Sequence, residues 1–519
     1  MRDRIATIKQ KVTKPGLGLR LTLVFLFVTW LGIVIFTIIN HEFWRDEVRS
    51  FSLSKNATSL VDLYYLLKHD GHPILWHLVL FIGTHILDSN LILPVSSLAI
   101  ATAAIIIFLK FSPFPIWFKA IFMFCGFPLY EYSVMARPYG LSMLLLFITA
   151  CVFRYREQHP IWLAVVLALL ANTNVHSVIL VGLVFLNWVL EDLLNPKKKS
   201  SLTIKRMIIP GVIVGTGIIL NLIFTLPRAD SIVIKIPSGI DFEQVILSVV
   251  QFIFLPNATF SKLFPSWVSP FWSLIIMVLV LLGLIKKPRL ILITILSQIA
   301  FGVLFFFVYE GDYRHQGLFL VFLIFLYWIT RSQESNTSDS VKKGALVKIG
   351  FIAITIMILM NCFIGINLVY EDIYQIRSSG KQLGEFLNHS ALYKNAIIVA
   401  EPDYSMESLP YYADNQIFFP RENRFGQTVQ WTAESSESIS ITDLLLTAQQ
   451  VRRIYDEPVL IVLGHFEINQ TTSGSKEFSY NKTFTWESKE LSTFLSSTKL
   501  IAVFDDAYTD ENYMVFVLK

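Results

Sequence analysis

Apolar segments long enough to cross a bilayer recur through the first 370 residues of this 519-residue chain. A hydrocarbon core of roughly 30 Å needs about 20 apolar residues in a helix. Because lipid offers the backbone no hydrogen-bond partner, only helices or closed barrels can cross it, and apolar runs without two-residue alternation indicate helices. We therefore expect an all-α polytopic membrane domain over residues 1–370, with about 11–13 helices.

These segments predict the individual spans. They are residues 17–40, 91–109, 115–130, 138–153, 160–173, 177–194, 207–226, 267–285, 290–308, 317–330 and 346–369. Residues 73–88 would have to begin and end on the outer side, so either they are re-entrant or the sides assigned to the neighbouring loops are wrong. Residues 245–256 are too short to span comfortably and are expected at the membrane interface.

Composition and charge exclude some classes of protein and give the orientation. With 54% hydrophobic and 16% charged residues, the chain has too little polar surface for a soluble protein. Its net charge of +4 comes from basic residues in short loops, a pattern typical of membrane topology and not of a nucleic-acid surface. The loops expected on the cytoplasmic side are the N-terminus, Arg154 with Arg156, Lys197 to Arg206, Lys286 to Arg289 and Arg331 to Lys343. An odd number of spans then places the C-terminal region outside, in a multi-pass protein of a plasma or inner membrane.

Residues 371–519 have a different composition, with mixed charges and turn residues. Short β-rich runs at 396–400, 459–464, 500–504 and 514–518 alternate with helical patterns at 373–388 and 440–454. Strands that alternate with helices predict a small α/β domain, which the topology places on the extracytoplasmic side.

Ionisable residues gather in loops on that same side. They are Asp46 and Glu47 in the first extracytoplasmic loop (41–72), His72 at its end, Glu131 with Arg137, and Arg314. Each could do no more than anchor or cap a helix at the membrane surface. The isolated His77, His85 and His176 are expected to be structural. Taken together, however, adjacent carboxylates offer a general base, and arginines on neighbouring loops match phosphate oxygens. This combination suits a reaction in which a hydroxyl is the nucleophile and a lipid phosphate is the leaving group.

The motifs around these residues resemble a known superfamily. Trp44-Arg45-Asp46-Glu47, followed by Asp70-Gly71-His72-Pro73, is similar to the first extracytoplasmic loop of GT-C glycosyltransferases of the family 39-like group. That group includes protein O-mannosyltransferases, lipid A aminoarabinose transferases and Rgt-type lipopolysaccharide transferases. Pro128 to Glu131, Ala136 to Leu141 and Tyr313 to Gly317 resemble its later motifs, so the likeness covers roughly residues 17–330. The chain departs from the pattern at Ile74 and His315, where relatives often have proline and tyrosine.

The resemblance implies an inverting transfer of a sugar from a polyprenyl-phosphate donor to a lipid, glycan or protein acceptor. Asp46 would be the base or help to place a divalent cation, with Glu47 assisting it. His72, Arg137 and Arg314 would contact the donor phosphate, and Glu131 would orient Arg137 or touch the sugar. The resemblance implies no nucleotide and no other cofactor.

Two other classes of protein compete with a transferase. A transporter or flippase for lipid-linked sugars should carry ionisable residues near the bilayer midplane, whereas here they lie at the ends of the spans. A membrane-anchored sensor would leave the numerous spans and the long first loop without a purpose.

Overall fold

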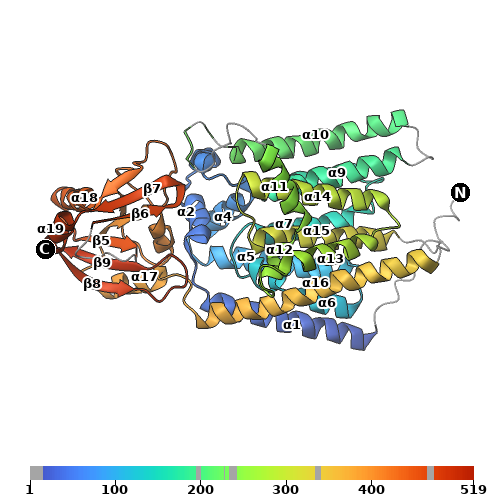
Figure 1. Cartoon of the computed structure of the whole chain (residues 1–519), viewed down its shortest axis with the longest axis horizontal. Helices are drawn as coiled ribbons and strands as arrows, with labels where there is room; N and C mark the ends of the chain where they lie inside the picture. The colour runs from blue at the N-terminus through green and yellow to red at the C-terminus, as the bar shows by residue number, and fades with distance from the viewer. Residues whose placement is uncertain are drawn as a thin grey trace.

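The computed structural model describes residues 16–194, 200–226, 228, 230–232, 242–333, 341–464 and 473–519. The N-terminal basic residues before Gly16, Lys197 to Lys199 and residues 334–340, which bear on the predicted orientation, lie outside these ranges. A bundle of helices forms one part of the molecule and a small α/β domain forms the other (Figure 1). The start of α1 and the α/β domain lie at opposite ends of the bundle (Figure 1).

The helical part confirms the predicted all-α membrane domain. Its elements are α1 (Leu17–Asn40), α2 (Arg45–Asn56), α3 (Leu60–Leu66), η1 (Leu67–His69), α4 (Ile74–Ile86), α5 (Ile92–Phe111), α6 (Ile116–Met123), η2 (Phe127–Glu131), α7 (Tyr139–Phe153), α8 (Pro160–Ala171), α9 (Val175–Leu193), α10 (Ser200–Thr225), α11 (Phe242–Ile253), α12 (Asn257–Ser261), α13 (Ser269–Leu282), α14 (Pro288–Phe307), α15 (Tyr313–Ser332) and α16 (Val341–Tyr374). In the described ranges, six helices are long and apolar enough to cross a membrane: α1, α5, α9, α10, α14 and α16. Shorter apolar helices complete the bundle: α4, α7, α8, α11 and α13. The chain is an integral, multi-pass membrane protein.

Three predicted segments differ from the observed helices. The first loop, 41–72, is largely helical, since α2, α3 and η1 lie within it. The expected span 115–130 is interrupted after Met123, where Pro128 lacks the N–H that a regular helix needs and Phe127–Glu131 forms a π-helical turn. The expected helix 373–388 is two helices, the end of α16 and α17 (Gly380–His389). Between them, Glu42 accepts the backbone N–H of Arg377, which replaces a bond within a helix.

The segment predicted at 73–88 begins and ends beside the α/β domain. Its first turn follows His72, which lines a cavity against that domain. Just beyond its end, the Asn90 side chain donates to the carbonyl of Tyr411, at 2.8 Å. Both ends of α4 therefore lie at the same end of the bundle.

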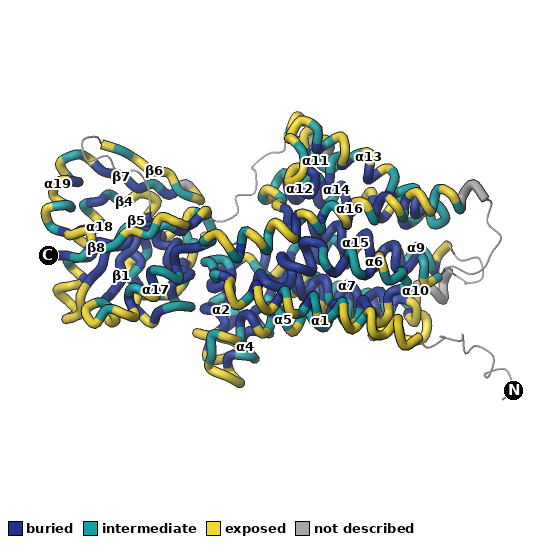
Figure 2. The backbone as a smooth tube through the Cα atoms, turned by 90° about the horizontal axis from the view of Figure 1, so that it is seen from below, coloured by how far each residue is buried: buried dark blue, intermediate teal, exposed yellow. Residues whose placement is uncertain are grey.

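The centre of the bundle is α15. Its residues from Gln316 to Thr330 are all buried, as expected for a helix that is apolar around its whole circumference. Outward faces of α1 and α13 are exposed, whereas the inner helices are dark blue along their length (Figure 2). At one end of the bundle, Glu191 pairs with Arg156 and Arg289, at 2.8 and 2.9 Å, so two of the basic loops predicted to be cytoplasmic lie together.

The C-terminal part confirms the predicted α/β domain. Its elements are α17, β1 (Ile397–Glu401), η3 (Asp403–Tyr411), β2 (Ile417–Phe419), β3 (Arg424–Phe425), β4 (Ser438–Ser440), α18 (Ile441–Ile454), β5 (Val459–Gly464), β6 (Gly474–Phe478), η4 (Ser479–Asn481), β7 (Lys482–Trp486), α19 (Ser488–Ser497), β8 (Thr498–Phe504) and β9 (Tyr513–Leu518). The main sheet has the strand order β3-β2-β1-β5-β9-β8, with β1 parallel to β2 and β5, and a smaller sheet has the order β4-β7-β6.

The two faces of the main sheet have separate cores. Ile397 and Val399 pack with α18, whereas Ile398 and Ala400, which alternate with them, pack with α17. Because β1 and β5 are buried on both faces, they read in the sequence as continuous apolar runs, and this is why they could be predicted.

Candidate functional site

A cavity of about 240 Å³ lies at the seam between the helical bundle and the α/β domain. Residues of the bundle that line it are Arg45, Asp46, Arg49, Asp70, His72 and Arg137. The α/β domain contributes Tyr404, Glu407, Trp431, Ser479 and Tyr480. The fold thus brings together three of the predicted site residues, Asp46, His72 and Arg137, which are up to 91 positions apart in the sequence.

Asp46 lies in the first turn of α2, with its side chain 39% exposed. The Arg137 guanidinium donates to the backbone carbonyl of Asp46 at 2.5 Å, and its Nη1 is 3.6 Å from the Asp46 carboxylate. Burial opposes ionisation of this carboxyl, but Arg137 and Arg314 outweigh it and lower the pKa of Asp46. Asp46 is therefore an ionised acceptor that faces the cavity.

The two arginines that lower the pKa of Asp46 both have unpaired guanidinium atoms, although only Arg137 lines the cavity. Arg137 Nε and Arg314 Nη1 are buried, and neither has a hydrogen-bond partner among the described residues. The Arg314 guanidinium lies 5.5 Å from the centroid of the Trp44 ring, next to Asp46 in the chain. Buried N–H groups are rarely left without a partner, so these donors indicate a place for an anion.

His72 lines the cavity at the start of α4. Its Nδ1 lies 3.0 Å from the Asp70 carboxylate, and Asp70 also accepts from Arg49 Nε at 2.7 Å. Burial would raise the pKa of Asp70, but His72 and Arg49 hold it well below its usual range. Arg49 continues to Glu407 of the α/β domain at 2.5 Å, so the His72 loop is fixed from both domains.

Glu47, predicted to assist Asp46, lies away from the cavity and is completely buried. Its carboxylate accepts the backbone N–H of Ala136 at 2.6 Å and lies 3.0 Å from His41 Nε2. In the chain, Asp46 directly precedes Glu47 and Arg137 directly follows Ala136. Glu47 therefore binds the segment that carries Arg137 and does not itself line the cavity.

His41 is held between two carboxylates. Its Nδ1 lies 2.9 Å from Asp372 and its Nε2 3.0 Å from Glu47, so both ring nitrogens must be protonated. Although burial lowers it, the two carboxylates raise the pKa of His41 to about 10. This imidazolium joins the ends of α1 and α16 to the start of α2.

Glu131 is buried. Of the acidic groups that raise the pKa of Arg314 against the effect of burial, Glu131 has the largest effect and Asp46 the next. Glu131 was predicted to orient Arg137 or to touch the sugar. No hydrogen bond or ion pair joins it to Arg137 among the described residues, and contact with the sugar stays a prediction. Tyr132, the next residue, donates its hydroxyl to the Arg314 carbonyl at 2.7 Å, so this turn fixes Arg314 in place.

The residues around Asp46 do not fit a metal site. In the part of the chain that the structure describes, no three His, Cys, Asp or Glu side chains are grouped to hold an ion. The neighbours of Asp46 that lower its pKa most are the guanidinium groups of Arg137, Arg314 and Arg45, which would repel a divalent cation.

The sequence did not predict the α/β domain's share of the cavity. Tyr404, Glu407, Trp431 and Tyr480 lie in η3, η4 and loops, and they follow no spacing that links them to the bundle. The three histidines expected to be structural have different surroundings. His77 is buried 3.4 Å from Asp70, and His176 packs against His315 with ring centroids 5.4 Å apart. His85 donates from Nδ1 to the Phe81 carbonyl, one turn earlier in the same helix.

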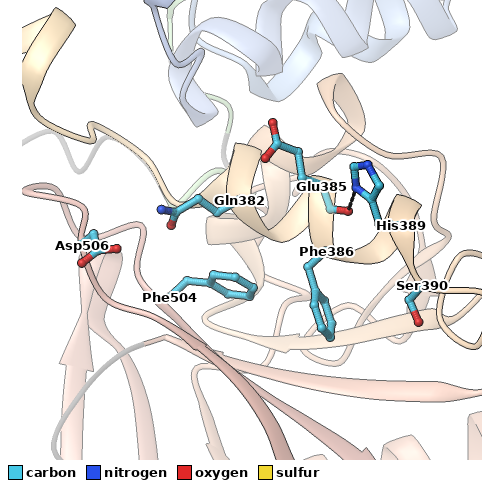
Figure 3. Close-up of a pocket in the computed structure, with 7 residues that line it drawn as sticks. All are labelled: Gln382, Glu385, Phe386, His389, Ser390, Phe504 and Asp506. Atoms are coloured by element: carbon cyan, nitrogen blue, oxygen red, sulfur yellow. Dashed lines mark hydrogen bonds between the residues drawn. The ribbon is translucent and has the colours of Figure 1, made fainter.

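A second hollow lies within the α/β domain, between α17 and β8 (Figure 3). Phe386 and Phe504 form its floor, with ring centroids 5.8 Å apart, and His389 bonds to the Glu385 carbonyl at 2.7 Å. It shares no residue with the cavity at the seam.

Comparisons with known proteins give structural neighbours only. No protein family model matches the chain, and a search of curated proteins finds no match. Among solved structures, the chain is similar to ArnT from Cupriavidus metallidurans bound to undecaprenyl phosphate, with 12% identity, a TM-score of 0.45, and coverage of 95% of this chain and 97% of that chain. The apo state of the same protein gives 13% identity, a TM-score of 0.44, and the same coverage.

Proposed function

We propose that this protein is a membrane glycosyltransferase that uses a polyprenyl-phosphate-linked sugar as donor. The observation that carries the proposal is the ionised carboxylate of Asp46 beside unpaired, buried guanidinium N–H groups of Arg137 and Arg314. A base next to a site for an anion is what attack by a hydroxyl with departure of a phosphate requires. The support for the proposal comes from this geometry and from the sequence motifs.

In the proposed reaction, the acceptor hydroxyl lies within reach of Asp46, which takes its proton. The hydroxyl oxygen attacks the anomeric carbon, and the bond from that carbon to the phosphate oxygen breaks with inversion. The bonding electrons leave on the polyprenyl phosphate. Arg137 and Arg314 neutralise the charge that develops there, because a guanidinium stays protonated and offers paired N–H donors.

The proposed orientation has the start of α1 on the cytoplasmic side and the α/β domain outside. Such an arrangement fits the separation of these parts at opposite ends of the bundle (Figure 1). A lipid-linked donor could then reach the cavity from the outer leaflet, and its polyprenyl chain would stay among the helices.

Asp46→Asn tests the proposal directly. We expect transfer to fall at least about 100-fold, since general base catalysis typically contributes that much, while donor binding changes little. The assay uses purified protein in nanodiscs with a panel of polyprenyl-phosphate sugars. Asp88→Asn, which changes an exposed carboxyl at the same end of the bundle, is the matched control. Replacing Arg137 or Arg314 by Gln should instead weaken donor binding.

Undiminished transfer by Asp46→Asn would remove this residue from the mechanism. Movement of the lipid-linked sugar across a vesicle membrane, without formation of a new glycosidic bond, would indicate a flippase and contradict the transferase.

A further inference from the structure

Three aromatic side chains of the α/β domain line the cavity that contains Asp46: Tyr404, Trp431 and Tyr480. The Trp431 ring lies 5.7 Å from that of Tyr404 and 4.7 Å from that of Tyr480, measured between centroids. Burial, and next the nearby Asp46 carboxylate, raise the pKa of Tyr480, so the Tyr480 hydroxyl and the proposed base are electrostatic neighbours.

Two of these aromatic residues have a backbone conformation that such residues rarely adopt. Within the described ranges, the non-glycine residues with positive φ are Asn423, Trp431 and Tyr480, and the last two have φ of 53° and 63°. Asparagine tolerates this region, but for a bulky aromatic residue it is strained. Strain of this kind persists where the surrounding structure imposes it, and it concentrates at functional sites.

The structure imposes the strain at Trp431 from both domains. Ile232 of the bundle donates its N–H to the Trp431 carbonyl at 3.2 Å, and Ala433 donates to Asp230 at 2.7 Å. On the other side, the Lys482 ammonium lies 5.0 Å from the centroid of the Trp431 ring. The ring is therefore held at the cavity by contacts that its own domain does not supply alone.

The remaining lining is polar. Among the described residues that line the cavity, none is aliphatic, so a lipid chain would find no aliphatic side chain to pack against there. Glu407 and Ser479 lie beside the aromatic rings and can exchange hydrogen bonds with hydroxyl groups. A sugar ring fits such a lining, because its C–H face packs on the negative face of an aromatic ring while its hydroxyls bond to polar groups.

We propose that the acceptor is a saccharide, and that Trp431 and Tyr480, with Tyr404, hold its terminal sugar ring so that one hydroxyl faces Asp46. This inference rests on the proposed transferase function and specifies its acceptor class. The α/β domain is then the acceptor-binding part of the enzyme, and the helical bundle binds the donor.

Linkage analysis of the product tests the acceptor class. Membranes that contain the full-length protein receive a radiolabelled polyprenyl-phosphate sugar, and the labelled product is permethylated and hydrolysed. We expect the label in a glycosidic bond to another sugar, and absent from products of Asp46→Asn. Label released by β-elimination from serine or threonine, or attached to a lipid without a sugar, would overturn the inference and leave the transferase function intact.

Variants of the aromatic residues test the assigned side chains. The acceptor in this assay is the glycan that the linkage analysis identifies, without the transferred sugar. Trp431→Ala and Tyr480→Ala should each raise the KM for this acceptor at least tenfold, with the KM for the donor changed less than twofold. Trp431→Phe, which keeps an aromatic ring, should raise the KM for the acceptor much less than Trp431→Ala does. Tyr455→Ala removes a tyrosine of similar exposure (40%, against 42% for Tyr480) outside the cavity and should change neither value.

The assignment would be overturned if the alanine variants raised the KM for the donor and the KM for the acceptor equally, or if they left the KM for the acceptor unchanged. Movement of the lipid-linked sugar without formation of a new glycosidic bond would contradict the proposed function itself, so the two failures are distinguishable.

Discussion

At the scale of single residues, the chemistry of this site depends on which of two adjacent carboxylates faces the cavity. Asp46 and Glu47 are neighbours in the first turn of α2, but successive residues of a helix point about 100° apart. Asp46 consequently lines the cavity, whereas Glu47 turns inward to His41 and the N–H of Ala136. A sequence motif identifies such a pair of carboxylates but does not show which of the two faces the cavity.

His41 gives this buried cluster a dependence on pH. Its folded-state pKa of about 10 exceeds the unfolded value of 6.5, so its contribution to stability is complete below about pH 6.5 and is lost as the pH rises through 10. We expect the free energy of unfolding to fall across this window by up to about 1.4 kcal/mol per pH unit. The thermal midpoint of the purified protein should fall with it.

Differential scanning fluorimetry from pH 6 to pH 10.5 measures this slope. His41→Gln, which cannot titrate, should be less stable at pH 7 and should have a flatter profile. A profile of His41→Gln parallel to that of the wild type would show that other groups cause the dependence. Glu47→Gln should flatten the profile in part and reduce transfer less than Asp46→Asn does.

At the scale of elements, α16 is the helix that links the bundle to the α/β domain, and glycines set how closely it packs. A Cβ built at Gly350 would lie 2.2 Å from the backbone nitrogen of Gly283, at the end of α13. A Cβ at Gly365 would similarly lie 2.8 Å from the nitrogen of Gly126. Small residues let helices approach at backbone distance within a membrane domain.

We therefore expect Gly350→Ala to destabilise the protein by about 1–3 kcal/mol, because backbone atoms must move to admit the methyl group. Gly344→Ala is the matched control, since it lies in the same helix and a Cβ there meets nothing within 4 Å. The control should be neutral or stabilising by up to about 1 kcal/mol. The thermal midpoints of the two variants are compared with that of the wild type in the same detergent. Equal shifts of the midpoint for Gly350→Ala and Gly344→Ala would contradict the close contact between Gly350 and Gly283.

The predictability of the elements follows from the same physics. Continuous apolar runs predicted α1, α5, β1 and β5. The two helices need few polar positions because lipid covers their exposed faces, and the two strands need none because both of their faces are buried. The break after Met123 and the helices of the first loop were missed, since tertiary contacts decide them and local periodicity does not.

At the scale of the whole molecule, the site exists only where the two domains meet. Arg49 joins Asp70 of the bundle to Glu407 of the α/β domain, at 2.7 and 2.5 Å. Arg45 similarly reaches Asp510 at 2.7 Å, 465 positions along the chain. Motifs in the outer loops allowed Asp46 and Arg137 to be placed together from the sequence. Contacts over such separations leave no local pattern, so the residues that the α/β domain contributes to the cavity could not be predicted.

A double-mutant cycle on Arg49 and Glu407 measures how strongly the domains are coupled. Both groups are almost completely buried and share a charge-assisted hydrogen bond, so removing one partner leaves the other uncompensated. We expect Arg49→Gln and Glu407→Gln each to destabilise the protein, with a coupling energy of about 1.5–3 kcal/mol. The exposed pair Lys55 and Asp88, 3.1 Å apart, is the control and should couple by less than about 1 kcal/mol. Equal coupling in the two cycles would mean that the buried bridge does not hold the α/β domain against the bundle, and the cavity would then need another cause for its closure.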